Sequence, residues 1–352
     1  MTHKLESAIR KALQKGRWLR FHRLLNAEAE LLLKNIESEK GKIPQQVKKL
    51  SKEYACDVLG WAGYAPWLKV YSAMAGTFKE GWIPDNYYGW VVVPKMKGFY
   101  GEIAKINPLA AKLLNTDRLP NIAYYVNGLF FSPAWEVLPP ETAEKYIFQH
   151  DSRVVYKTDD SSQGQGIYFI DKETFNVEKI RKAGNGIFQK YIHQHEFFEE
   201  FMPNSVATLR LTTVVEDDGN ASCRAAYLRI GRNEDTHVKS ATSVKVPLDL
   251  KTGKLFEKGY LTNWRSIDRH PDTNTLFAGK KMPKFHECVS LITKIHQTIP
   301  YCRSVGWDLI VDKNEEIQLM EWNGTFNDIK FSEATQGPCF ADLGWEKLWR
   351  VQ

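Results

Sequence analysis

From about residue 82 onward, short apolar runs separated by proline, glycine and polar residues recur along the chain, and this pattern predicts β-strands. The runs are rich in β-branched and aromatic residues and are bounded by polar or glycine-bearing turns. We predict strands at 90–93, 122–126, 128–131, 154–157, 167–170, 186–192, 205–215, 225–231 and 244–248. Helical spacing instead predicts helices at 4–23, 27–36, 45–54, 108–114, 142–148 and 283–299. The chain is therefore expected to be an α+β protein with a helical N-terminal region.

The stretch 305–323 predicts a β-hairpin in which polar residues interrupt two apolar strands. Its strands are 307–311 and 317–322, and the polar turn 312–316 joins them. Antiparallel pairing brings Asp308 at one end close to Glu321 and Asn323 at the other. Oxygen donors of this kind suit Mg²⁺. The alternative is a surface hairpin with solvated acids, but a buried carboxylate needs a partner, and a metal ion is one.

The stretch 153–170 predicts two strands around a polar loop at 158–166. Because a strand and not a helix follows the loop, it is neither a P-loop nor a Rossmann turn. Gly164 and Gly166 allow a ligand to approach the backbone, and Ser161 and Ser162 add hydroxyl donors. Lys157, just before the loop, is placed to neutralise a phosphate. A flexible hairpin turn is the alternative interpretation.

Further along, a predicted strand carries Lys190 and ends before Glu196, six residues later. A purine needs backbone donors and acceptors from an edge strand, and a ribose needs a carboxylate, so this spacing can serve both. Arg210 lies inside an apolar strand, where burial is costly unless the guanidinium meets an anion. A basic set follows, and we expect it to bind a substrate carboxylate: Arg224, Arg229, Arg232, His237 and Lys239.

Size and composition narrow the class of protein. A chain of 352 residues is expected to hold two or three domains. No apolar run reaches the length of a membrane span, and no signal peptide is recognised. Five scattered cysteines without a CxxC motif favour a reducing cytoplasm over a disulfide framework or a zinc site. The net charge of +6 suits an anionic ligand but does not imply nucleic acid.

The predicted helix at 4–23 is amphipathic and strongly basic. Apolar residues recur at Leu5, Ile9, Leu13 and Leu19, and Glu6 is the only acid among seven basic residues. Such a helix can lie on an anionic membrane. We prefer the alternative that its apolar stripe packs on its own domain.

The ordered set of these residues resembles the ATP-grasp superfamily. The second half of the chain is similar to one branch, the sugar-transfer-associated ATP-grasp proteins of bacterial surface-polysaccharide clusters. The stretches that carry this closer similarity are SVATLRLTTV at 205–214, HPDTNTLFAG at 270–279, VGWDLIVD at 305–312 and LMEWNGTFND at 319–328. The resemblance covers residue 153 to about 345 and extends more loosely back to residue 82.

The resemblance implies an ATP-grasp fold, in which two α+β lobes hold ATP, and a role for each matching residue. Lys157 and Lys190 would hold the α/β-phosphates and the adenine side, with Ser161, Ser162, Gly164 and Gly166 in the loop over the phosphates. The backbone of Tyr191 and Ile192 would meet the adenine, and Glu196 the ribose. Asp308, Glu321 and Asn323 would coordinate two Mg²⁺ ions. Arg210 would stabilise charge on the transferred phosphoryl group.

Some positions depart from the family pattern. The first lysine of other ATP-grasp enzymes falls near Pro108, where only Lys105 or Lys112 is close, so it is not assigned. Ala207 replaces a common Asn, and Gln163 and Gln165 stand where a basic residue is often found. The resemblance divides the chain into a helical N-terminal region at 1–80, a small α/β region at 81–150, a small lobe at 151–200 and a large lobe at 201–352.

The family reaction implied here is amide formation through an acyl phosphate, with small-molecule carboxylate and amine substrates. A nucleotide-sugar or a glycan is a further candidate substrate. Two alternatives remain open: an ATP-dependent kinase of a sugar hydroxyl, and a non-catalytic nucleotide- or glycan-binding module. The second predicts lost metal ligands, and all three are present. The expected location is the cytoplasm.

Overall fold

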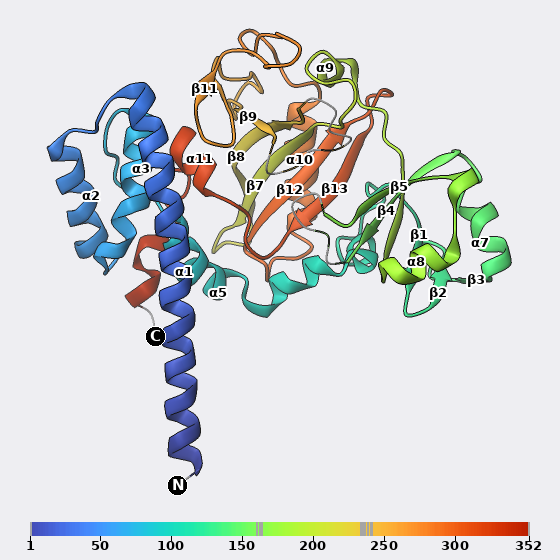
Figure 1. The fold of residues 1–352 in the computed structure, drawn as a ribbon, viewed down its shortest axis with the longest axis horizontal. Helices are drawn as coiled ribbons and strands as arrows, with labels where there is room; N and C mark the ends of the chain where they lie inside the picture. The colour runs from blue at the N-terminus through green and yellow to red at the C-terminus, as the bar shows by residue number, and fades with distance from the viewer. Residues whose placement is uncertain are drawn as a thin grey trace. The chain divides into compact units, whose positions relative to one another are not determined.

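The computed structural model describes residues 2–159, 161, 165–232, 237, 239 and 242–350, and for residues 2–5 and 8 the backbone alone. The chain divides into two compact units (Figure 1). Unit 1 comprises Met1–Gly98, Asn263–Arg265 and Asp328–Gln352, and unit 2 comprises Phe99–Thr262 and Ser266–Asn327. This division does not test the four segments expected from the sequence, which remain a prediction.

Unit 1 is helical and is built around α3 (Ala65–Ala75), which packs against α1, α2 and α11. Pro66 lies in the first turn of α3, and Gly76 ends it with a φ of 76°. Trp67, Leu68 and Tyr71 of this helix are fully buried. The longer helices of the unit are α1 (Thr2–Lys40), α2 (Gln45–Asp57) and α11 (Lys330–Thr335). Short helical turns complete it: η1 (Ala62–Tyr64), α4 (Asp85–Tyr87), η2 (Tyr88–Val92), α5 (Val93–Met96) and η6 (Trp345–Arg350).

Two predictions for this part of the chain are corrected. The expected helices at 4–23 and 27–36 form one helix, α1, because the residues between them, Leu24 to Asn26, include no glycine or proline to break it. The expected strand at 90–93 is helical, in η2 and α5. A short apolar run does not distinguish a buried strand from a buried helical turn, and Val91 and Val92 are buried here as parts of a helix.

Unit 2 contains the strands that the structure describes, in two sheets. In the larger, seven described strands pair in the order β11-β10-β9-β8-β7-β12-β13. Every pair in it is antiparallel. The helix α10 (Phe285–His296) packs on β7, β8 and β12 with Phe285, Cys288, Ile292 and Ile295 buried. The strands are β7 (Thr208–Val215), β8 (Ala221–Ile230), β9 (Val244–Pro247), β10 (Gly259–Tyr260), β11 (Ser266–Ile267), β12 (Ser304–Val311) and β13 (Ile317–Asn323).

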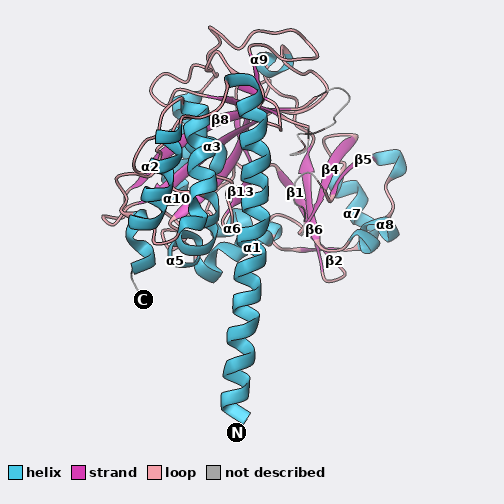
Figure 2. Cartoon of the chain, turned by 60° about the vertical axis from the view of Figure 1, so that its left-hand side comes forward, coloured by secondary structure: helices cyan, strands magenta, loops and turns pink. Residues whose placement is uncertain are grey.

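The smaller sheet has the order β3-β2-β1-β6-β4-β5 over the described part of the chain. Ala143, Ile147 and Ile180 of α7 and α8 share one core with Val154 and Phe188 of the sheet, and Figure 2 shows these helices beside it. The strands are β1 (Asn121–Val126), β2 (Leu129–Phe131), β3 (Val137–Leu138), β4 (Arg153–Thr158), β5 (Ile167–Asp171) and β6 (Gly186–Lys190). The remaining helices are η3 (Gly98–Lys105), η4 (Asn107–Leu109), α6 (Ala110–Leu113), α7 (Pro140–Ile147), η5 (Lys172–Thr174), α8 (Val177–Ala183) and α9 (Glu196–Glu199).

The expected hairpin is confirmed as β12 and β13, joined at 312–316. Its register is interrupted by a bulge at Met320, since Asp308 pairs with Glu321 but Leu309 pairs with Leu319. The extra residue lets Leu319 and Trp322, three positions apart, both pack in the core of the large sheet. Glu321, between them, is turned to the opposite face.

In the described part of the chain, no helix is long and apolar enough to cross a membrane. All five cysteines are free thiols.

Candidate active site

One face of the large sheet carries a row of ionisable residues across four adjacent strands. Glu321 of β13 pairs with Asp308 of β12, which pairs with Arg210 of β7, which pairs with Tyr227 of β8. Directly opposed residues in an antiparallel pair lie within about 5.5 Å at Cβ. Two carboxylates thus stand side by side with a guanidinium next to them.

Asp308 and Arg210 form a buried bidentate ion pair. Nε and Nη2 of Arg210 donate to Oδ1 and Oδ2 of Asp308 at 2.6 and 2.8 Å, and Nη1 of Arg229 donates to Oδ2 at 3.3 Å. Burial opposes ionisation of Asp308, but the two guanidiniums outweigh it, so the pKa of Asp308 lies below its ordinary value. A buried carboxylate needs a cation and a buried guanidinium needs an anion, and Asp308 and Arg210 supply these partners to each other within the protein.

Glu321 is in the opposite electrostatic situation. Glu321 lines the hollow, and its carboxylate takes no hydrogen bond from the residues that the structure describes. The pKa of Glu321 is raised, first because the surrounding protein disfavours the charged form and then because the charge of Asp308 repels it. Lys157, Arg210 and Arg229 offset this only in part. A cation between the two carboxylates would relieve their repulsion.

Asn323 lies two residues beyond Glu321 on the same face of β13 and opposite Gly306. Its Nδ2 donates to the carbonyl of Gly306 at 3.3 Å, which leaves Oδ1 for a ligand. Gly306 is required here, because a Cβ at this position would meet Cβ of Asn327 at 2.9 Å. The sequence thus brings Asp308, Glu321 and Asn323 to one patch, as the hairpin predicted.

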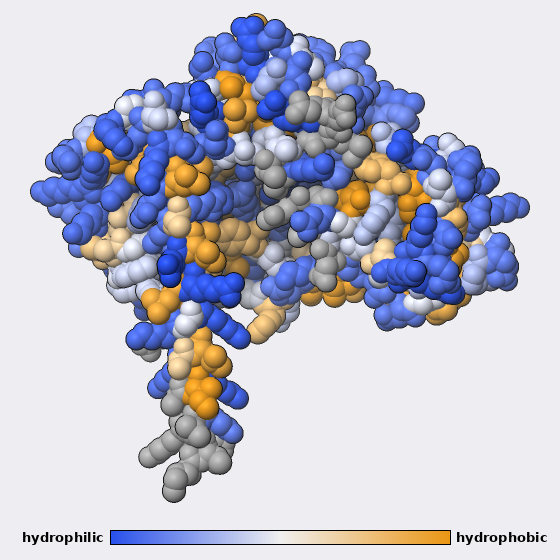
Figure 3. Space-filling model, in the orientation of Figure 1, coloured by the Kyte–Doolittle hydropathy of each residue, from blue (hydrophilic) through white to orange (hydrophobic). Residues whose placement is uncertain are grey.

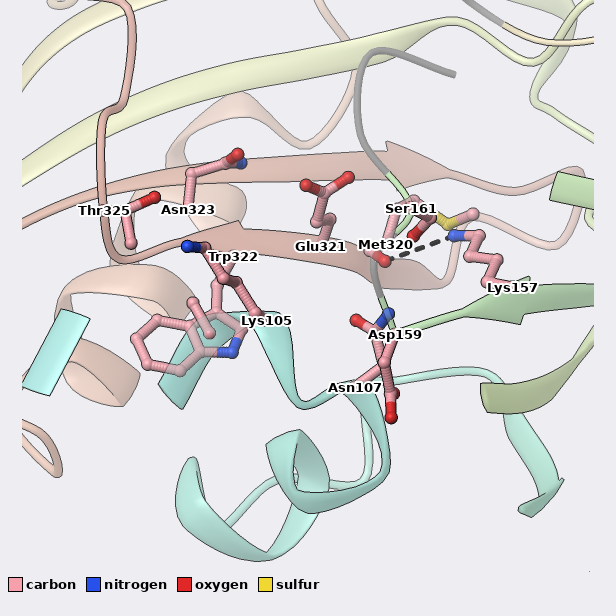
Figure 4. A pocket seen from close by; sticks show the side chains of 11 residues that line it. Lys105, Asn107, Lys157, Asp159, Ser161, Met320, Glu321, Trp322, Asn323 and Thr325 are labelled. Atoms are coloured by element: carbon pink, nitrogen blue, oxygen red, sulfur yellow. Dashed lines mark hydrogen bonds between the residues drawn. The ribbon is translucent and has the colours of Figure 1, made fainter. Parts of the chain in front are cut away.

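A hollow of about 210 Å³ opens in front of Glu321 and Asn323 (Figure 4). Lys157 of β4 faces Glu321 across it, and its Nζ donates to the carbonyl of Met320 at 3.4 Å. The lining is contributed by both sheets and by the segment around η3 and η4: Ala104, Lys105, Asn107, Lys157, Asp159, Ser161, Met320, Glu321, Trp322, Asn323 and Thr325.

Strand alternation explains why Lys157 points into the hollow. Val154 and Tyr156 are buried in the core of the small sheet, so Lys157 takes the other face of β4. Burial lowers the pKa of Lys157, while the charges of Glu321 and Asp308 act in the opposite direction. A cation in this setting is well placed to hold an anion that enters the hollow.

Other predicted nucleotide contacts lie in different places. Ser161 lines the hollow, and Gly166 has a φ of 74° that favours glycine, whereas Ser162 and Gly164 lie outside the described residues. The four residues of the predicted adenine and ribose contacts are not part of the lining that the structure describes, and their roles remain predictions: Lys190, Tyr191, Ile192 and Glu196.

Their surroundings differ. Lys190 is exposed at the end of β6, and Ile192 is buried in the core of the large sheet. The ring of Tyr191 lies 5.5 Å from the guanidinium of Arg153 and 6.0 Å from the ring of Phe169. Glu196 is exposed at the first position of α9.

The arginines of the predicted basic set pair with three different acidic residues. Arg224 binds Glu216 at 2.6 Å, and Arg232 binds Asp272 through two bonds of 2.8 and 2.9 Å. Arg229 joins Asp308, as described above. The ring of His237 lies 6.0 Å from that of Phe169, and Lys239 is exposed. Of the three arginines, Arg229 is thus the one that reaches the row of ionisable residues through a described contact.

The sequence did not assign several residues that line the hollow. Asn107 donates to the carbonyl of Thr158 at 3.1 Å and so joins η4 to the end of β4. Lys105, which pairs with Glu102, was one of the two lysines near the expected first-lysine position, and the lining contains it but not Lys112. Asp159 lies inside the predicted loop and Thr325 lies two residues beyond Asn323, and no pattern in the sequence singles out either residue.

Within the described residues, no group of three or more histidine, cysteine or acidic side chains is placed to hold a metal ion. The predicted oxygen donors nevertheless suit magnesium. The predicted set is different in kind: an unbonded carboxylate, an amide oxygen and a buried carboxylate beside them. Hard oxygen donors of this kind suit Mg²⁺, which keeps several waters and substrate oxygens in its shell. Both oxygens of Asp308 already accept from arginines, so Glu321 and Asn323 are the more available ligands.

Comparison with known proteins assigns the fold. Residues 179–341 match the family described as sugar-transfer associated ATP-grasp. The chain has an ATP-grasp fold. The matched segment includes Arg210, Asp308, Glu321 and Asn323, whereas Lys157 and the glycine loop precede it. The resemblance seen in the sequence is therefore confirmed over this segment. No curated protein matches the chain.

Solved structures similar to this chain include two biotin carboxylases and a ligase. The biotin carboxylase from Campylobacter jejuni is 13% identical, with a TM-score of 0.46 over 91% of this chain and 68% of its own. The biotin carboxylase domain of the Hydrogenobacter thermophilus 2-oxoglutarate carboxylase is 14% identical, with a TM-score of 0.44 over 71% of this chain and 46% of its own. The L-amino acid ligase from Bacillus licheniformis is 11% identical, with a TM-score of 0.38 over 70% of this chain and 48% of its own.

The chain thus spans just under half the length of the last two proteins. At these identities and TM-scores, the similarity to solved structures carries no information about the activity of this chain.

Proposed function

We propose that the protein is a Mg-ATP-dependent carboxylate–amine ligase that works through an acyl phosphate. The observation that carries the proposal is the cross-strand pair of Asp308 and Glu321, which faces Lys157 across the hollow. A pair of opposed carboxylates is unfavourable unless cations compensate it. Arg210 and Arg229 compensate Asp308, so Glu321 is the carboxylate left to hold a metal ion.

In the proposed reaction, an oxygen of the substrate carboxylate attacks the γ-phosphorus of ATP and ADP leaves. The amine nitrogen then attacks the acyl carbon, inorganic phosphate leaves, and the amine loses a proton. Mg²⁺ would neutralise phosphate charge and orient the terminal phosphate. The second ion expected from the family is part of this proposal.

The residues of the chain supply position and charge. Glu321 and Asn323, with Asp308 beside them, would hold the metal, and Lys157 would neutralise a phosphate oxygen from the opposite wall. Arg210 is held by Asp308, so it fixes the carboxylate and adds positive charge to the face on which the phosphoryl group is transferred. The hollow is smaller than the roughly 300–1,000 Å³ of a drug-sized ligand site. We therefore assign it to the phosphate end of the nucleotide.

The finer assignments belong to the same proposal. Ser161, Ser162, Gly164 and Gly166 would contact phosphate, and the segment from Lys190 to Glu196 would contact the nucleoside. Arg229 is the first candidate to orient the acceptor carboxylate, since it shares the site face, with Arg224, Arg232, His237 and Lys239 around it. The acceptor would be a sugar or amino-acid precursor of a bacterial surface polysaccharide, modified in the cytoplasm.

The test is Mg²⁺-dependent ATP turnover with a panel of uronic acids, amino acids and nucleotide-sugars. Glu321→Gln keeps the shape of the side chain but removes its charge, and we expect a loss of about 100-fold or more. Glu315→Gln is the matched control, because Glu315 is an acid of the same hairpin that pairs with Lys284 at 3.1 Å.

The products separate the alternatives. Release of ADP and phosphate together with an amide supports the ligase, whereas phosphate retained on the acceptor identifies a kinase of a hydroxyl group. Full activity of Glu321→Gln, or the absence of any Mg-ATP binding, contradicts the proposed site. Tight Mg-ATP binding without turnover across the panel identifies a binding module.

A further inference from the structure

The N-terminal half of α1 is not used by the proposed reaction, and its charge is unusual. Residues 4–23 hold seven basic residues and one acid, a net charge of +6. This equals the net charge of the whole chain, so the other 332 residues are neutral together. The next part of the same helix, residues 24–40, is acidic, with four glutamates and two lysines. Positive charge is therefore concentrated in one segment.

This segment extends beyond the other helices of unit 1 (Figures 1 and 2). Packing on the unit begins at Trp18 and His22, whose rings lie 4.6 and 4.8 Å from that of Trp61. Every described side chain from residue 6 to residue 17 is exposed. The expectation that the apolar stripe packs on its own domain is therefore wrong for this half of the helix.

The exposed apolar residues share one side of the helix. Ile9, Leu13 and Leu19 are 50, 59 and 52% exposed, which is unusual for large aliphatic side chains. At about 100° per residue they fall, with Ala12 and Gly16, within an arc of about 120°. Figure 3 shows apolar surface along this projecting segment. The arc is opposite to the side on which Trp18 and His22 contact the unit.

Basic residues occupy the rest of the circumference between residues 10 and 17. Arg10, Lys11, Lys15 and Arg17 are all exposed and fall outside the apolar arc. Long basic side chains beside an apolar stripe place their stems along an acyl surface and their charges among headgroups. A second copy of the chain is a poor partner for this face, because two segments of charge +6 repel each other.

We propose that this half of α1 lies on an anionic lipid surface, with Ile9, Leu13 and Leu19 inserted at the headgroup boundary. Both required features are present in one segment: exposed apolar area and concentrated positive charge. The helix lies on the bilayer and does not cross it, because no described helix is apolar enough to span one. The proposal does not depend on the reaction carried out by unit 2.

The test is co-sedimentation of the full chain with vesicles of phosphatidylcholine alone and with 30% phosphatidylglycerol, read against the protein that stays in solution. We expect at least about tenfold stronger binding to the anionic vesicles, weakened by salt. The double variant Ile9→Glu/Leu13→Glu removes the apolar contact and should abolish binding. Leu31→Glu is the matched control, because Leu31 is 60% exposed on the same helix but lies outside the basic segment.

Three results would overturn the proposal. One is equal binding to neutral and anionic vesicles, and another is binding that persists in the double variant, which would indicate charge attraction alone. The third is a dimer in light scattering that the double variant abolishes while vesicle binding is absent, which would make a second copy the occupant. Circular dichroism of the double variant checks that the helix is retained.

Discussion

Arg210 and Asp308 show how a charged pair is kept inside a sheet. Each residue is costly to bury alone, and each is almost fully buried here, 6 and 4% exposed. Their bidentate contact and the contact from Arg229 satisfy both oxygens of the carboxylate. The same contacts fix the position of Asp308 beside Glu321, so the pair has a structural role as well as its place in the proposed site.

Removing one member of this pair should therefore be far worse than replacing both. We expect Arg210→Ala to lower the free energy of unfolding by about 3–5 kcal/mol, since it leaves a buried carboxylate with one weaker partner. The double variant Arg210→Met/Asp308→Leu removes both charges and should lie closer to the wild type. Urea denaturation measures both. An Arg210→Ala variant as stable as the wild type would show that the pair is solvated in solution.

Residue patterns in the sequence predicted this face well and the hollow only in part. Asp308, Glu321 and Asn323 share one patch because the predicted hairpin pairs Asp308 with Glu321. For Lys157 the sequence indicated only a place on the strand before the loop, and its position in the hollow comes from the structure. Lys105 and Asn107 were not assigned. They reach the hollow through contacts between segments about 50 and 200 residues apart, such as Asn107 to Thr158, and a single sequence gives no signal for such distances.

At the scale of elements, the pairing of β4 with β6 sets the position of Lys157. Gly186 of β6 lies opposite Thr158, and a Cβ on Gly186 would meet the carbonyl oxygen of Lys157 at 2.2 Å. The clash is with the backbone, so no side-chain rotation relieves it. The close approach of these two strands therefore requires glycine.

We expect Gly186→Ala to force β4 away from β6, to cost about 1–3 kcal/mol of stability, and to weaken Mg-ATP binding by moving Lys157. The control is Gly128→Ala in the same sheet, where φ is 92° and an added Cβ would have no described atom within 4 Å. It should cost about 1–2 kcal/mol through backbone strain but leave nucleotide affinity unchanged. Calorimetry and nucleotide titration of both variants separate the two effects. Equal affinities for the two variants would contradict the role given to this strand pair.

Strand and hairpin signals were reliable because alternation and turn residues are local. The hairpin of β1 and β2 turns at Asn127 and Gly128, both with positive φ, as an Asn-Gly pair predicts. The helical turn η2 was misread because its apolar run is short and because Val91 and Val92 are buried, as they would be in a strand. The helices α8 and α11 were missed, since each has only six or seven residues and little helical period to detect.

At the scale of the molecule, unit 1 contains two buried ionisable groups whose pKa values are shifted in opposite directions. Burial lowers the pKa of His22 to about 4 among its aromatic neighbours and raises the pKa of Glu333 to about 7. Protonation of His22 destabilises the folded unit, so its contribution is present above pH 6.5 and is lost as the pH falls toward 4. The neutral form of Glu333 is favoured in the folded unit, so its contribution is present below pH 4.5 and is lost as the pH rises through 7.

Between pH 4.5 and 6.5 the two contributions, each roughly 3 kcal/mol at most, should nearly cancel in the wild type. His22→Phe keeps the packing with Trp18 and Trp61 but removes the ionisable ring, so its stability should fall with rising pH across this window. Hydrogen exchange of the α3 amides as a function of pH measures unit 1 by itself. A variant with the same flat profile as the wild type would mean that His22 does not titrate as its burial implies.

The discontinuous make-up of unit 1 bears on the order in which a ribosome completes this protein. Nε1 of Trp82 donates to the backbone carbonyl of Glu333, and the backbone N–H of Ile83 donates to the carboxylate of the same residue. Glu333 is made some 250 residues after these two partners. Domains usually fold as they emerge during synthesis. Unit 1 cannot be completed until the segment that begins at Asp328 has been made, whereas the residues of unit 2 have all been made before that segment. A nascent chain stopped before residue 328 would therefore expose the unfinished core of unit 1, and a protease or chaperone could recognise the unfinished protein by it.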